Sequence, residues 1–101
     1  MSGYRLAPRA TDDLFEAYIQ GHDLFGERQA DAYQDGATRL FERLADYPRL
    51  GRELTEFSPP VRVIPYNAHV VIYEESAGGV TILRVRHSHE DWTSSPLEGT
   101  P

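Results

Sequence analysis

The residues with the most side-chain chemistry lie together near the end of the chain, in the stretch ILRVRHSHEDW at residues 82–92. This stretch begins apolar and then presents two arginines, two histidines, two carboxylates and the only tryptophan of the chain. Guanidinium groups bind carboxylates and phosphates, and histidine gains and loses its proton near neutral pH. The stretch is therefore either a small acid–base site or a surface that binds another macromolecule.

Two chemical interpretations centre on HSHED, residues 87–91. A His-x-His pair with nearby carboxylates can supply metal ligands. On a strand, His87 and His89 would point the same way about 6.6 Å apart and could serve as an acid–base pair. Both interpretations depend on one local pentapeptide without a distant third partner, and ordinary surface histidines are the commoner explanation. We therefore predict no catalytic residue, no metal ligand and no cofactor.

The composition excludes several classes of site. The chain has 101 residues, which suits one domain, and it has no cysteine. Disulfides, thiolate metal sites and thiol nucleophiles are therefore excluded together. All ten basic residues are arginine, so no lysine is present to act as an acid, a base or a Schiff-base former.

The charge and hydropathy of the chain also limit its partners. The formal net charge is -6, with 16 acidic residues against 10 basic ones. Polyanion binding depends on Lys and Arg that neutralise phosphates, so we expect no direct binding of nucleic acid. No segment approaches the roughly 20 apolar residues of a membrane span, and the start MSGYRLAPRA lacks the apolar core of a signal peptide. We expect a cytoplasmic protein without membrane contact.

Hydrophobic periodicity predicts the elements that must position residues 82–92. They are a strand at 3–7, a helix from Pro8 that stops within 20–26, a second helix to 47, a loop at 49–60, and strands at 61–66, 69–75 and 79–87. The order β-αα-βββ predicts an α+β domain with an N-terminal helix hairpin packed on one face of a mainly antiparallel sheet. We place the domain at residues 1–92 and expect a flexible tail at 93–101.

Each predicted helix has an apolar face that should pack on the sheet. In the first helix Leu14 and Tyr18 recur at helical spacing, with Phe15 and Ile19 beside them. The second helix, within ERQADAYQDGATRLFERLADYP, follows the i, i+3, i+4, i+7 rule over its length. Gly36 inside this helix indicates either a close helix contact or plain tolerance.

Side chains alternate along a strand, so the last predicted strand has two faces. Leu83 and Val85 should meet the helices, which leaves Arg84 and Arg86 side by side on the open face. Such a face suits an acidic, partly apolar partner segment. The alternative is that both arginines lie on a solvated face and bind water and carboxylates such as Glu74.

Four segments of the chain resemble the ParE-like toxins, which belong to the ParE/RelE superfamily of bacterial type II toxin–antitoxin systems. The segments are YRLAPRATDDL, DYPRLGREL, VRVIPYNAHVVIYEE and GVTILRVRHSHEDW. They occur in the order and spacing of that family, and the similarity covers about residues 4–92. No single segment is specific, but all four together at this spacing are hard to obtain by chance.

The resemblance implies a RelE/ParE-like fold and a small toxin neutralised by a cognate ParD-like antitoxin. The antitoxin's carboxy-terminal segment is expected to lie over the helix hairpin and along the sheet. The resemblance further implies that the toxin inhibits DNA gyrase by protein–protein contact, without catalysis.

Two alternatives remain open. The first is a RelE-like toxin that cleaves messenger RNA on the ribosome. The second is a protein with the toxin fold that is no longer toxic and serves as a binding module. The nuclease fits less well, because the chain is acidic, lacks lysine and has no tyrosine after Trp92.

Two positions depart from the family pattern. Ala7 stands where a Ser or Thr usually precedes the proline, so the usual N-cap hydrogen bond should be missing. Ser88 and His89 replace the usual Gly-Arg, which puts toxicity in question and would make a substitute contact through His89 depend on pH.

The facing arguments and the resemblance together predict two sets of site residues. The predicted target-binding surface is Arg62, Arg84, Arg86, His87, His89 and Trp92. The predicted antitoxin groove is Leu14, Tyr18, Leu40, Leu44, Val71 and Tyr73. Changing Arg84 and Arg86 together to alanine is expected to reduce toxicity and to leave the fold intact.

Overall fold

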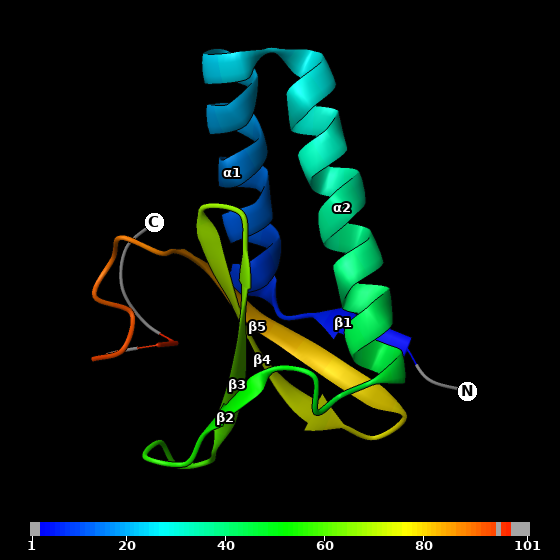
Figure 1. Cartoon of the computed structure of the whole chain (residues 1–101), viewed down its shortest axis with the longest axis vertical. Coiled ribbons are helices and arrows are strands. Elements are labelled where there is room, and N and C mark those ends of the chain that lie inside the picture. Colours follow the sequence, from blue (N-terminus) through cyan, green and yellow to red (C-terminus); the bar gives the residue numbers. More distant parts are fainter. Residues whose placement is uncertain (1–2, 95, 98–101) are drawn as a thin grey trace.

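A computed structural model describes residues 3–94 and 96–97 as a helix hairpin that stands on one face of a five-stranded sheet (Figure 1). The elements are β1 Gly3–Leu6, α1 Pro8–Phe25, α2 Glu27–Asp46, β2 Arg52–Leu54, β3 Val61–Tyr66, β4 His69–Ser76 and β5 Gly79–His87. The predicted α+β class is confirmed, and so is the order of elements apart from β2. The turn between α1 and α2 lies far from the sheet (Figure 1).

The helix hairpin forms much as the sequence predicts. Pro8 occupies the first turn of α1, where its missing N–H costs nothing, and Ala7 provides no side-chain cap, as expected. Gly21 is tolerated inside α1, and the chain turns at Gly26 instead. The φ of Gly26 is 92°, a conformation that side chains with a Cβ rarely adopt. A glycine at this position therefore permits the tight reversal into α2.

The sheet has the strand order β1-β5-β4-β3-β2, with β1 parallel to β5 and the other neighbours antiparallel. The loop predicted at 49–60 contains β2, which pairs with the first half of β3. That prediction was wrong because a strand of three residues is too short to show alternation. Pro65 pairs with Val70 of β4 and lies beyond the end of β2, so no residue of β2 requires its missing N–H.

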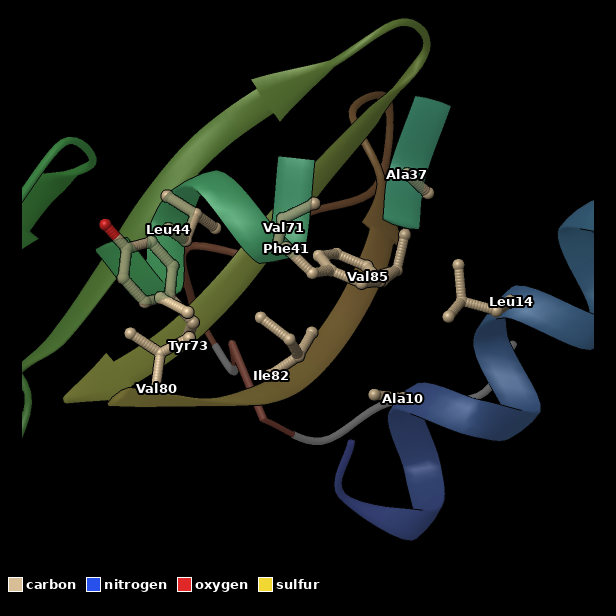
Figure 2. Close-up of a cluster of buried hydrophobic side chains, with 11 residues drawn as sticks. Ala10, Leu14, Ala37, Phe41, Leu44, Val71, Tyr73, Val80, Ile82 and Val85 are labelled. Carbon is tan, nitrogen blue, oxygen red and sulfur yellow. The ribbon is translucent and has the colours of Figure 1, made fainter. Parts of the chain in front are cut away.

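The main core lies between the hairpin and the sheet (Figure 2). Phe41 and Leu44 of α2 pack among Val71 and Tyr73 of β4 and Ile82 of β5. Each of these side chains is at most 2% exposed. Because burial of large apolar side chains is the main favourable term in folding, this cluster fixes the hairpin on the sheet.

Two tyrosine hydroxyls bind the backbone where glycine allows a close approach. The Tyr73 hydroxyl accepts a hydrogen bond from the Gly51 N–H at 2.7 Å and donates to the Pro48 carbonyl at 2.8 Å. The Tyr66 hydroxyl donates to a carbonyl of α2 at 2.8 Å. A Cβ at Gly36 would collide with that hydroxyl. Gly36 therefore marks a close contact of α2 with the sheet, not with α1.

A second core covers the other face of the sheet. Its half-buried outer layer includes Trp92, which packs there together with Phe57 and Leu83. The buried members are Leu54, Val61, Val63, Val70 and Ile72. The chain after β5 thus folds back over the face that the helices leave open.

A β-bulge changes the facing of β5. The register of β4 against β5 shifts between Ile72 and Tyr73, so that Leu83 is an extra residue in β5. Ile82 before the bulge and Val85 after it both face the hairpin, whereas Leu83 packs in the second core. The predicted facing, which placed Leu83 against the helices and Ile82 on the open face, is wrong because strict alternation does not continue across a bulge.

Candidate functional site

Arg84 is a buried residue whose charge is neutralised inside the protein. It is 2% exposed, and its Nε and Nη2 donate to the two carboxylate oxygens of Asp13 at 2.7 and 3.0 Å. The same carboxylate accepts the backbone N–H of Val85 at 2.9 Å, in the part of β5 that extends past β1. The prediction that Arg84 stands on an open face is therefore wrong. Its guanidinium ties α1 to β5.

Arg86 forms a similar pair with the loop that follows β5. Its Nε and Nη2 donate to Glu90 Oε2 at 3.3 and 2.9 Å, and Glu90 Oε1 accepts the His87 N–H at 3.0 Å. Burial by itself would raise the pKa of Glu90, but these hydrogen bonds and the nearby guanidinium charges outweigh burial and lower that pKa. Arg86 is 5% exposed, so its predicted place on an open face is also wrong.

The segment near the C-terminus completes the hydrogen bonding of both guanidiniums. Arg84 Nη1 donates to the Leu97 carbonyl at 3.1 Å, and Arg86 Nη1 donates to the Pro96 carbonyl at 3.2 Å. Arg9 of α1 donates to the same Leu97 carbonyl at 3.1 Å. Of the tail predicted to be flexible, Pro96 and Leu97 thus contact the domain, and residues 95 and 98–101 lie outside the described residues.

Arg62, the third arginine of the predicted target surface, also serves the fold. Its Nη1 donates to the Gly51 carbonyl at 2.8 Å, and its guanidinium lies 3.8 Å from a Glu53 oxygen and 4.0 Å from a Glu75 oxygen. Its side chain is only 16% exposed. Arg62 therefore braces the segment before β2 against the sheet.

These contacts overturn one expectation about substitution. Removing the guanidiniums of Arg84 and Arg86 would leave the buried Asp13 carboxylate without its cation. Breaking a buried pair from one side costs about 3–5 kcal/mol, a large part of the stability of a domain of this size. The double alanine variant is therefore expected to lose stability, so a loss of toxicity in it would not identify a binding surface.

Three histidines and a tyrosine form a row across the end of the sheet. Tyr33 Oη and His69 Nδ1 share a hydrogen bond of 2.9 Å. The ring centroids of His69 and His87 are 5.1 Å apart, and the stacked rings of His87 and His89 are also 5.1 Å apart. Burial, followed by the charge of His87, lowers the pKa of His69 against the smaller opposite effect of two carboxylates. The sequence predicted that His87 and His89 face the same way, but it did not connect them to His69 and Tyr33.

A cleft of about 730 Å³ separates α1 from the histidine row. The wall formed by α1 includes Phe15, Glu16, Ile19 and Asp23, which fall on one side of the helix. The opposite wall belongs to the ends of β4 and β5 and to the loop after them. It is lined by His69, Arg84, Val85, His87 and Glu90.

Most of the predicted antitoxin groove is not accessible. Leu14, Leu44, Val71 and Tyr73 are at most 9% exposed and belong to the main core. The prediction of an accessible groove at these four positions is wrong. The remaining two, Tyr18 and Leu40, are half-buried.

The accessible apolar surface lies on the side of α1 that lines the cleft and at the tip of the hairpin. Phe15 is 65% exposed and Ile19 is 44% exposed, and at the tip Leu24 and Phe25 are 67% and 62% exposed. The sequence held a signal for this surface, since α1 has more large apolar residues than one packed face requires. The prediction grouped Phe15 and Ile19 with the packed face of the helix and so missed it.

Two searches among the described residues concern other classes of site. No group of three or more histidine and acidic side chains is placed there to hold a metal ion. Across residues 3–94, no helix has both the length and the apolar character needed to cross a membrane.

Known proteins share both the sequence pattern and the fold. The family described as "ParE toxin of type II toxin-antitoxin system, parDE" matches residues 4–92. A solved structure described as "Chromosomal ParDE TA system from P. aeruginosa" is 18% identical in sequence, with a TM-score of 0.72 over 86% of this chain and 96% of that chain. No curated protein matches the chain. The structural likeness shows a common fold, and the family match covers almost the whole sequence. The chain therefore belongs to the ParE toxin family of type II toxin–antitoxin systems.

Proposed function

We propose that this protein is the toxin of a type II toxin–antitoxin pair, that a ParD-type antitoxin restrains it, and that it inhibits DNA gyrase through protein–protein contact. Membership of the ParE toxin family supports the toxin and antitoxin parts of this proposal. The observation that carries the choice of contact over catalysis is the commitment of Arg62, Arg84 and Arg86 to acceptors within the protein.

Cleavage of RNA requires groups that hold the phosphate, stabilise developing charge and transfer protons. Arg84 and Arg86 are nearly inaccessible, and each already donates to a carboxylate and to a backbone carbonyl. A phosphate would have to displace these acceptors from a closed site. This arrangement supports a toxin that acts through its surface.

The target surface that we propose consists of the exposed end of the histidine row and the loop after β5. His89 is exposed and His87 is half-buried. Glu90 holds this loop through Arg86 and through the His87 N–H. Arg84 and Arg86 then act as positioning residues, whereas the contacts of Arg62 hold the segment before β2 and are not part of this surface.

The antitoxin surface that we propose is the exposed side of α1 that lines the cleft. Phe15 and Ile19 lie one turn apart there, and Leu24 and Phe25 are further exposed apolar residues at the hairpin tip. Exposed groups of large apolar side chains commonly mark protein–protein contacts. A bound antitoxin segment would cover them.

The experiment that tests this proposal is supercoiling of relaxed plasmid by DNA gyrase in the presence of the purified protein. Inhibition that a ParD-type antitoxin reverses is the expected result. His89→Ala should weaken inhibition by about tenfold, because a central contact residue contributes about 1–2 kcal/mol. His22→Ala changes an exposed histidine on α1 and is the matched control, for which inhibition should not change.

Supercoiling that continues unchanged in the presence of folded protein would overturn the gyrase target. In that case translation-dependent cleavage of messenger RNA would establish the nuclease alternative, with His69, His87 and His89 as the proton-transfer candidates. Absence of growth arrest together with tight antitoxin binding would instead identify a binding module without toxicity.

A further inference from the structure

The cleft beside α1 offers acidic charge to a partner. Its lining residues include four carboxylates and one guanidinium. Two of the carboxylates, Asp13 and Glu90, already have arginine partners. The other two, Glu16 and Asp23, take part in none of the ion pairs found among the described residues. They are therefore the charges available for binding.

Most of the hairpin carries charge of the same sign. Residues 12–35 include seven acidic residues and one arginine, a formal charge of -6, of which Asp13 is neutralised by Arg84. A surface of one sign attracts partners of the opposite sign and raises their rate of association. The hairpin should therefore attract a cationic segment.

Apolar side chains line the same wall of the cleft as the unpaired carboxylates. Phe15 and Ile19 are both exposed, and they alternate along α1 with Glu16 and Asp23. The opposite wall contributes Val85 and the half-buried histidine rings. A segment that fits this cleft must therefore carry large apolar side chains as well as positive charge.

We infer that the cleft binds a segment of the antitoxin that is cationic and apolar, with large apolar side chains over Phe15 and Ile19 and arginine or lysine side chains that reach Glu16 and Asp23. The inference rests on the proposed function, which supplies an antitoxin as the occupant. The structure supplies the chemistry of the segment. This segment is cationic, whereas the predicted open face of Arg84 and Arg86 favoured an acidic segment.

An acidic segment would meet like charge in this cleft. The guanidinium that could attract it, Arg84, is 2% exposed and bound to Asp13. Each carboxylate brought next to Glu16 or Asp23 would be repelled, and like charges across an interface select against a partner. Charge therefore discriminates between the two kinds of segment more than apolar contact does.

The test is calorimetric titration of the full-length protein with two synthetic amphipathic helical peptides at low salt. The peptides share leucines at positions i, i+4 and i+7 and differ only in having arginine or glutamate at the flanking positions. The arginine peptide should bind about tenfold more tightly than the glutamate peptide, since two partly shielded ion pairs separate them. Equal affinity, or tighter binding of the glutamate peptide, would overturn the inference.

Variants locate the binding within the cleft. The double variant Glu16→Gln, Asp23→Asn should weaken binding of the arginine peptide about fivefold, and Glu42→Gln on α2 is the matched control. Phe15→Ala with Ile19→Ala should weaken binding on the order of thirtyfold, and Leu50→Ala, another exposed apolar residue, is its control. Both pairs are exposed, so melting temperatures should stay close to that of the unchanged protein.

Titration with the ParD-type antitoxin separates failure of this inference from failure of the proposed function. If the antitoxin binds tightly and the Glu16→Gln, Asp23→Asn variant binds it equally well, the cationic segment is wrong and the toxin–antitoxin pairing stands. If the arginine peptide binds in the cleft and the antitoxin does not bind at all, the chemistry of the cleft stands and the antitoxin as its occupant is wrong.

Discussion

Arg84 and Phe15 line the same cleft, and their exposure is the reverse of their polarity. Arg84 is 2% exposed, whereas Phe15 is 65% exposed. Burial of an ion costs several kcal/mol, which the paired Asp13 carboxylate must offset, and a Phe left in water forgoes about 2 kcal/mol of burial. Both departures need a reason. For Arg84 the reason is structural, since it joins α1 to β5, and for Phe15 we propose a partner.

Polarity does not separate buried from exposed side chains at this cleft. Arg84 has acceptors on α1 and on the segment near the C-terminus, so its donors are occupied. Phe15 is excluded from both cores. The number of partners that a side chain has inside the protein indicates its role better than its chemical type does.

The largest effect that tests this comparison is expected for Arg84→Ala. The change leaves the buried Asp13 carboxylate without its cation, so the free energy of unfolding should fall by about 3–5 kcal/mol. Denaturation by urea, followed by circular dichroism, measures the loss. A variant with unchanged stability would contradict the structural role of Arg84.

A double variant, Asp13→Leu with Arg84→Met, tests whether the loss of stability comes from the unpaired charge. Replacing both members of a buried pair by apolar residues of similar size removes the unpaired charge. It should recover much of the stability that Arg84→Ala loses. Full recovery is not expected, because the Val85 N–H also loses its acceptor.

A smaller effect is expected for Glu90→Gln, which alters the second ion pair. The side chain of Glu90 is 31% exposed, compared with 5% for Asp13, so solvent already screens this pair. The loss should be about 1 kcal/mol at neutral pH. Because the pKa of Glu90 is lowered in the folded state, this stabilisation is present above the ordinary value of 4.5 and falls as the pH drops below it. A loss as large as that of Arg84→Ala would show that exposure does not distinguish the two pairs.

The smallest effect concerns the histidine row. Burial and His87 lower the pKa of His69 below 6.5, so the folded state favours the neutral ring. The unfolded chain takes up this proton first as the pH falls, and stability should therefore decline below about pH 6.5. Melting temperatures measured between pH 7.5 and 5.5 should fall, and His69→Gln should make that fall less steep. An unchanged slope in the variant would exclude His69 as its cause, and His22→Ala should keep the original slope.

Much of the fold could be predicted from the sequence, because it depends on repeated local patterns. The helical periodicity of α2 reflects its one buried face, and the break near Gly26 marks the turn between the helices. β4 is readable as a continuous apolar run because both of its faces are buried, one in each core. The strand β2 could not be predicted, because its pairing with β3 is a tertiary contact of three residues.

The site was harder to predict, because the chain after β5 covers a face that strand alternation alone leaves open. Arg84 and Arg86 do face away from the main core, but Glu90 and the segment near the C-terminus contact and bury them. The bulge at Leu83, which carries no marker such as glycine, reverses only the facing predicted for Ile82 and Leu83. The partners of these arginines, Asp13 and Glu90, come from different parts of the sequence and could not be paired with them by spacing. Exposure of Phe15 likewise depends on which side of α1 meets the sheet.

The bond between Asp13 and Arg84 joins residues 71 positions apart, and β1 pairs with β5 across a similar distance in the sequence. Neither contact can form until residues 79–84 have been synthesised, because the later partner does not exist before then. Folds that depend on such long-range contacts are completed late and slowly. A nascent toxin therefore cannot close its fold on the ribosome before β5 emerges. A partner that restrains the folded protein, such as an antitoxin already present, can therefore be in place before folding is complete.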